Sequence, residues 1–209
     1  MILRWKGDVL GYSKPESLRS VIPGDMFGLN SYEKGGYVLY MLREQIGDAA
    51  FFKTMQTYAQ RFHFSNATSD DFWTVAEEVS GQDLSQFFTQ WVTYTDLPHV
   101  SVTWVSHDTP NGGSQVDALI CPANPKPYVL DLPVVLKPGI SVTPTTLPAM
   151  ALQNTSQIET IHLTGASQNL HWTAPFSVQT WSIDPRNSVL VSTSVQHVSD
   201  SLPSVCPTS

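Results

Sequence analysis

The chain has 209 residues, of which 41% are hydrophobic and 14% are charged, a composition typical of folded proteins. Its length allows one large or two small domains, each able to bury a core. The formal net charge of -7 argues against a nucleic-acid partner, because no basic surface is available to replace the counterions of the phosphates. No apolar run approaches the roughly 20 residues that cross a bilayer, so we expect no membrane span.

Residues 30–97 have the apolar spacing and the polar ends of helices, and we expect 1–97 to be a helical domain. Asn30 or Ser31 is predicted to cap a first helix that runs to Ile46, and Gly47 is predicted to end it. A second helix follows at once, with aromatic residues at helical spacing. The residues before Asn30 contain prolines and glycines without a sustained period, and we expect them to be irregular.

Two further helices are predicted before residue 97. The sequence Thr-Ser-Asp-Asp at residues 68–71 has the form of a capping box, and Gly81 follows the apolar face that it opens. Asp83 is predicted to start the fourth helix.

The period of the apolar residues changes to two after Pro98, which is typical of strands. Eight of the 11 Lys and Arg residues lie before Phe62, so the charge distribution also places a boundary near Leu97. Six or seven short strands in residues 98–209 predict an antiparallel β-sandwich. The predicted strands lie at 100–105, 116–121, 128–136, 158–163, 176–183 and 189–195.

Two cysteines and two sequons bear on the compartment of the protein. Cys121 and Cys206 are too few for a zinc ribbon, which leaves a disulfide or two buried thiols, and the thiols are favoured. Asn66-Ala67-Thr68 and Asn154-Thr155-Ser156 are glycosylation sequons. Together with the abundance of Ser and Thr, the sequons favour an extracellular or exported parent protein.

Most catalytic motifs are missing from the sequence. A helical zinc site needs two histidines four residues apart with a Glu beside the first, and none of the six histidines fits. We expect these histidines to be surface or hydrogen-bonded residues and assign no metal ligand. Ser31 and Lys34 match the Ser-x-x-Lys of penicillin-binding serine hydrolases, although the companion motifs are absent. That serine hydrolase is one alternative function.

A longer stretch carries a resemblance. The sequence from Ser31 to Arg43, SYEKGGYVLYMLR, resembles the aminopeptidase N family of zinc metallopeptidases, the gluzincins that include membrane alanyl aminopeptidases. The later aromatic and glycine positions up to Leu97-Pro98 follow the order of that family, and the strand ending at Pro185 resembles the close of its β-sandwich. The resemblance implies an α+β fold: the helical C-terminal part of a thermolysin-like catalytic domain in 1–97, followed by an antiparallel β-sandwich in 98–209.

The resemblance also implies a function. In this family zinc is held by a His-Glu-x-x-His helix and a later Glu, whereas Tyr32 falls on the Tyr that donates a hydrogen bond to the tetrahedral intermediate. The zinc ligands are expected upstream of Met1, so we expect the chain alone to bind no zinc and to act on peptide substrates only when completed. The other alternative is a non-catalytic scaffold or binding module. The sequence leaves the oligomeric state open.

The neighbours of Tyr32 receive no chemical role. Glu33 and Lys34 are predicted to form a solvated or cap-side pair, and Gly35-Gly36 is predicted to allow close helix packing.

Overall fold

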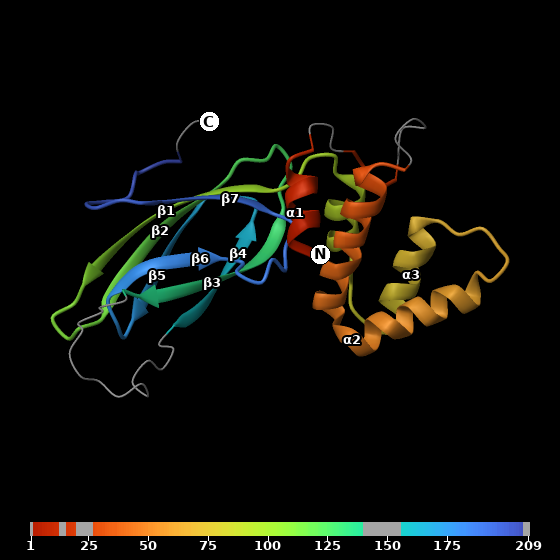
Figure 1. Ribbon diagram of the computed structural model, residues 1–209, viewed down its shortest axis with the longest axis horizontal. Helices are drawn as coiled ribbons and strands as arrows, with labels where there is room; N and C mark the ends of the chain where they lie inside the picture. Colours follow the sequence, from red (N-terminus) through yellow and green to blue (C-terminus); the bar gives the residue numbers. More distant parts are fainter. Residues whose placement is uncertain (1, 13–15, 20–26, 140–155, 207–209) are drawn as a thin grey trace. The chain divides into compact units, whose positions relative to one another are not determined.

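The computed structural model describes residues 2–12, 16–19, 27–139 and 156–206. The chain forms two compact units, one made of Met1–Leu97 with Asn187–Leu190 and the other of Pro98–Arg186 with Val191–Ser209. The first unit is helical and the second is built from strands (Figure 1). We refer to them as the helical unit and the sheet unit. The predicted α+β fold class is confirmed.

The helical unit begins with a helix that the sequence did not predict. Residues 2–10 form α1, although the segment before Asn30 was expected to be irregular. Val9 is buried, and the ring of Trp5 lies so close to Gly36 that a Cβ added there would be 2.9 Å from it. Tertiary packing therefore supports a helix whose local signals are weak. The elements of the helical unit are α1 (Ile2–Leu10), the π-helical turn η1 (Asn30–Lys34), α2 (Gly35–Arg61), α3 (Ser69–Ser80), α4 (Ser85–Phe88) and the π-helical turn η2 (Thr89–Thr93).

The stop predicted at Gly47 is present as a break inside α2. Gly47 has φ 79° and ψ 161°, which is not helical, and the ribbon of α2 bends along its length (Figure 1). Positive φ is accessible to glycine at little cost because it has no Cβ. The predicted cap at the other end is wrong, since neither Asn30 nor Ser31 caps a helix through its side chain. The chain is already helical at Leu29.

The third predicted helix has both of its predicted ends. Thr68 accepts a hydrogen bond from the amide of Asp71, and the Asp71 carboxylate accepts one from the amide of Thr68, so the capping box is complete. Gly81 ends α3 in the left-handed conformation. Aromatic rings fill the space between α2, α3 and α4, with Tyr58 and Phe72 5.2 Å apart and Trp73 stacked on Phe88 at 5.4 Å. Across the described ranges, no helix is both long and apolar enough to cross a bilayer.

The sheet unit consists of two sheets, with strand orders β5-β2-β1-β7 and β4-β3-β6. All pairings are antiparallel except β1 with β7, which is parallel. Trp104 and Trp172 of the first sheet meet Trp181 of the second at 5.3 and 5.9 Å, so the core lies between the sheets. The strands are β1 (His99–Asp108), β2 (Ser114–Pro122), β3 (Val129–Pro138), β4 (Gln157–Thr164), β5 (Gln168–Ala174), β6 (Val178–Ile183) and β7 (Ser192–His197).

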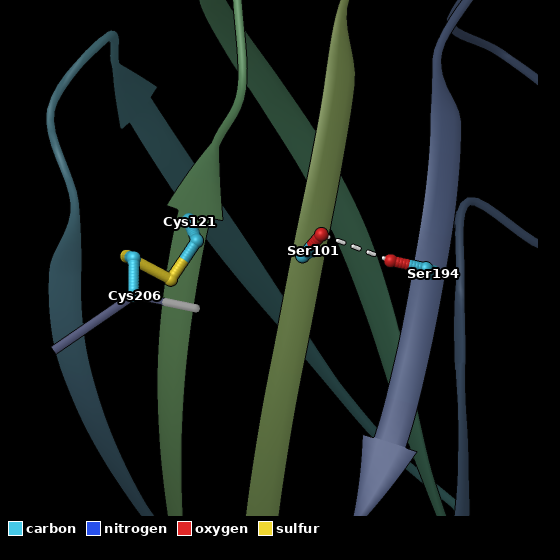
Figure 2. Close-up of a disulfide and its surroundings, with 4 residues drawn as sticks. All are labelled: Ser101, Cys121, Ser194 and Cys206. Atoms are coloured by element: carbon cyan, nitrogen blue, oxygen red, sulfur yellow. Dashed lines mark hydrogen bonds between the residues drawn. A yellow bond between two sulfur atoms is a disulfide. The ribbon is translucent and has the colours of Figure 1, made fainter. Parts of the chain in front are cut away.

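The two cysteines form a disulfide, which corrects the expectation of free thiols. Cys121 lies on β2, and its sulfur is bonded to that of Cys206 near the end of the chain (Figure 2). Ser101 on β1 is paired with Cys121 in register, and Ser194 on β7 donates a hydrogen bond of 3.0 Å to Ser101. The disulfide fixes the C-terminal segment to a central strand of the four-stranded sheet.

Candidate functional site

Tyr32 lies on η1 with 60% of its surface exposed, at a groove of about 550 Å³ within the helical unit. We call it the Tyr32 groove. Most of its walls are apolar and come from the 16–19 segment, α2, α3, α4 and η2. They include Leu18, Val38, Leu42, Phe72, Phe88 and Val92. A concave apolar site of this size with a polar group at its edge is typical of a small-ligand or side-chain pocket.

The π-helical turn explains why Tyr32 faces outward. Asn30 and Lys34 are four residues apart on this turn, and both are almost completely buried, at 2% and 1% exposure. Tyr32 lies midway between them, so its side chain leaves the opposite side of the turn. Single π-helical turns are frequent at functional sites.

Lys34 is buried, which corrects the expectation of a solvated pair with Glu33. Its Nζ donates hydrogen bonds to the carbonyl oxygens of Glu16, at 2.8 Å, and Tyr94, at 3.3 Å. Burial lowers the pKa of Lys34 from 10.5 to about 8, and the negative charge of Asp96 opposes this shift. Sequence analysis missed this residue because its spacing also fits an exposed helix position.

The Ser-x-x-Lys alternative needs Ser31 and Lys34 to interact. The Lys34 ammonium instead bonds to main-chain carbonyls, and among the described residues no hydrogen bond joins it to Ser31. Gly36 has the packing role predicted for the glycine pair, because the Trp5 ring occupies the space beside it.

The described residues do not fit a zinc site. Within them, no group of three or more His, Cys, Asp or Glu side chains is arranged to hold a metal ion. The described lining of the Tyr32 groove contains none of these residue types. His162 and His171 lie on the sheet unit, each exposed and hydrogen bonded at 2.6 Å to an aspartate, Asp131 and Asp117 respectively. These two match the expectation of surface, hydrogen-bonded histidines.

The fold is similar to part of a solved structure. The chain has the fold of part of a solved aminopeptidase, the crystal structure of Legionella pneumophila aminopeptidase A in complex with aspartic acid. The TM-score is 0.61 at 16% sequence identity, and the match covers 87% of this chain and 20% of the other.

Sequence comparison then shows which family the helical unit resembles. Residues 7–91 match the peptidase family M1 domain, so the helical unit is related to the M1 metallopeptidases. Aminopeptidase M1-C of Oryza sativa subsp. japonica is 36% identical over 84 residues, which are 40% of this chain and 10% of the relative. Aminopeptidase N of Lactococcus lactis subsp. lactis is 36% identical over 70 residues, which are 34% of this chain and 8% of the relative.

These matches extend over only part of each protein. The chain spans about a tenth of the length of the curated relatives that it matches. The resemblance to a part of an aminopeptidase of the aminopeptidase N family is confirmed, and Tyr32 lies within the matched residues.

Proposed function

We propose that this chain forms part of the active site of a zinc-dependent aminopeptidase, which removes N-terminal residues from peptides. The observation that carries the proposal is the position of Tyr32, exposed at the edge of an apolar groove inside the stretch related to the M1 domain. In this proposal the Tyr32 hydroxyl donates a hydrogen bond to the oxyanion of the tetrahedral intermediate. Such a donor lowers the barrier because it meets charge that develops only during the reaction.

The Tyr32 groove is proposed to receive part of the peptide. Its walls are provided by Val38, Leu42, Phe72 and Phe88, so an apolar side chain would be desolvated there at little cost. The groove lining has no charged side chain among the described residues that would favour an acidic or basic substrate residue.

The metal is proposed to come from residues outside these 209. The sequence has no His-Glu-x-x-His, and the described residues do not fit a zinc site. Zinc would polarise the scissile carbonyl and activate water in the complete enzyme. The 209-residue chain by itself is therefore proposed to be inactive.

A segment exchange tests this function. Residues 1–97 would replace the corresponding segment of Lactococcus lactis aminopeptidase N, so that Trp5, Val92 and Tyr94 are included. Hydrolysis of aminoacyl p-nitroanilides would be measured with and without Tyr32→Phe. We expect a folded, zinc-containing hybrid whose turnover depends on Tyr32. A folded hybrid with zinc whose turnover is the same with Phe at position 32 would overturn the proposal.

The isolated chain would be assayed for zinc, and tight binding of one equivalent would contradict the external origin of the metal.

A second candidate is a non-catalytic binding module. It is favoured by a groove of about 340 Å³ in the sheet unit, outside the stretch related to the M1 domain. His107, Asp117, His171 and Asp200 contribute to its walls. This candidate predicts that the isolated chain is a stable monomer, whereas aggregation through the apolar Tyr32 groove would contradict it.

The protein is further proposed to work in an oxidising compartment. The Cys121–Cys206 disulfide supports this, because such bonds persist mainly in exported proteins. Asn66 of the first sequon is exposed between α2 and α3, whereas Asn154 of the second lies outside the described residues. Free thiols in protein isolated from its native source would contradict the assignment.

A further inference from the structure

The turn that carries Tyr32 is held from its buried side by two polar side chains. Asn30 and Lys34, at the two ends of η1, both bind the main chain of Glu16. The amide of Glu16 donates to Asn30 Oδ1 at 3.4 Å, and the carbonyl of Glu16 accepts from Lys34 Nζ at 2.8 Å. The two ends of η1 are therefore linked to one residue of a distant segment.

Lys34 also links this segment to the end of η2. Its second hydrogen bond goes to the carbonyl of Tyr94. Ser17 and Leu18, which follow Glu16, both donate to the carbonyl of Val92 at 2.9 Å. Three stretches of chain thus meet at the Lys34 ammonium, and two of them, through Leu18 and Val92, also form walls of the Tyr32 groove.

A lysine at this position needs an explanation other than stability. Removing an ammonium from water costs several kcal/mol, and an apolar side chain of similar size often packs at least as favourably. Two directed hydrogen bonds, however, fix geometry in a way that apolar contacts do not. The buried ammonium and the exposed phenol belong to one short turn, so the constraint on Lys34 is also a constraint on the direction of Tyr32.

We propose that Lys34 is a positioning residue, which with Asn30 fixes the π-helical turn so that the Tyr32 hydroxyl is held at the edge of the groove. This inference rests on the proposed function for its catalytic consequence. Its structural content, the local ordering of η1, concerns the 209-residue chain alone.

Hydrogen–deuterium exchange of the 209-residue chain tests the structural content. Lys34→Met keeps the length of the side chain but cannot donate, and Lys34→Gln can donate but is too short to reach both carbonyls. Lys53→Met is the matched control, because Lys53 is exposed on α2. We expect exchange in residues 29–36 to be roughly tenfold to a hundredfold faster in both Lys34 variants. This factor corresponds to the loss of one hydrogen bond from a charged group. Protection of α3 should be unchanged, and Lys53→Met should match the parent chain.

Two results of this experiment would overturn the proposal. Unchanged exchange in residues 29–36 would show that Lys34 does not order the turn. Loss of protection in both η1 and α3, in both Lys34 variants, would show that Lys34 supports the whole unit rather than the turn.

Kinetics of the zinc-containing hybrid test the catalytic consequence. Misplacing a reacting group by about 1 Å can cost on the order of 100-fold in rate. Lys34→Met should therefore lower kcat by up to about 100-fold, while KM stays nearly constant. Because Lys34 is proposed to act through Tyr32, the double variant Lys34→Met/Tyr32→Phe should be no slower than Tyr32→Phe alone. Additive losses would overturn the positioning role.

The two arms separate the possible failures. If Tyr32→Phe leaves turnover unchanged, the proposed function fails, while the exchange experiment still decides whether Lys34 orders η1. If Tyr32→Phe is slow and Lys34→Met is as fast as the parent hybrid, only the positioning role fails.

Discussion

Different interactions stabilise the fold of the helical unit and the fold of the sheet unit. The sheet unit has a core between two sheets, with three tryptophans in contact across it, and a disulfide that joins residues 85 apart in sequence. The helical unit contains no cysteine and depends on capping and aromatic packing. It also carries the exposed Tyr32 and its groove. The unit with the candidate site is therefore the one without a covalent link.

Removing the disulfide should affect the sheet unit most. A closed loop of this length contributes about 4–5 kcal/mol in the chain-entropy model, so Cys121→Ala/Cys206→Ala should lower the free energy of unfolding of the sheet unit by about that amount. Denaturation followed by hydrogen–deuterium exchange of β2, for the sheet unit, and by helical circular dichroism, for the helical unit, would measure each unit separately. Ser101→Ala/Ser194→Ala, in the same row of the sheet, removes one hydrogen bond and should cost about 1 kcal/mol. An equal shift of the helical signal would contradict the separate stabilisation of the units.

Tyr32→Phe should affect activity without affecting stability. Loss of one oxyanion donor lowers kcat by about 10²–10³, or about 2.7–4 kcal/mol of transition-state stabilisation. Because most of the side chain is exposed, the free energy of unfolding should change little. Turnover and thermal unfolding would be compared between the zinc-containing hybrid and its Tyr32→Phe variant. A stability loss that accompanies the rate loss would indicate a structural role instead.

The buried Lys34 should make the helical unit more stable as the pH rises. Its pKa is about 8 in the folded chain and 10.5 in the unfolded chain, so between these values the unfolded chain binds more protons. The free energy of unfolding therefore increases with pH across this window, by about 3 kcal/mol in all. Denaturation from pH 7 to pH 11 would measure it as the difference between the parent chain and Lys34→Met. A difference that does not depend on pH would show that the ammonium is not desolvated.

The smallest effect is expected at the capping box of α3. Thr68→Ala removes the side-chain oxygen that accepts from Asp71, and should lower the stability of the helical unit by about 1 kcal/mol. Thr74→Ala, at an exposed position of the same helix, should not lower it, because Ala has the higher helix propensity. Equal effects of the two substitutions, measured by chemical denaturation, would contradict the role of the cap.

Features with a local cause could be predicted from the sequence. The capping box at Thr68, the left-handed Gly81 and the break at Gly47 depend on residues close in sequence, and all three are present. Strands whose apolar residues alternate were also found, β1 and β3 among them. The order of helices followed by strands gave the fold class.

Features with a distant cause were missed. Helix α1 depends on the packing of Trp5 at Gly36. Strand β5 was overlooked because its Gln, Asn and His residues favour strands only weakly, whereas its pairing with β2 stabilises it as a strand. Lys34 is buried by segments that lie 18 and 60 residues away. The disulfide likewise joins distant residues. The position of Tyr32 at a groove was not visible in the sequence, although its family resemblance named the residue.

The short segment Asn187–Leu190 belongs to the helical unit although it lies between two strands of the sheet unit. Tyr37 on α2 donates to the carbonyl of Asn187 at 2.5 Å, and the amide of Leu190 donates to the sulfur of Met41 at 3.2 Å. During synthesis the ribosome therefore releases β1 to β6 before the helical unit has received its last segment. The helices that carry Tyr32 reach their final packing only after most of the sheet unit has been made, so a nascent chain stopped at Leu97 would lack part of that core.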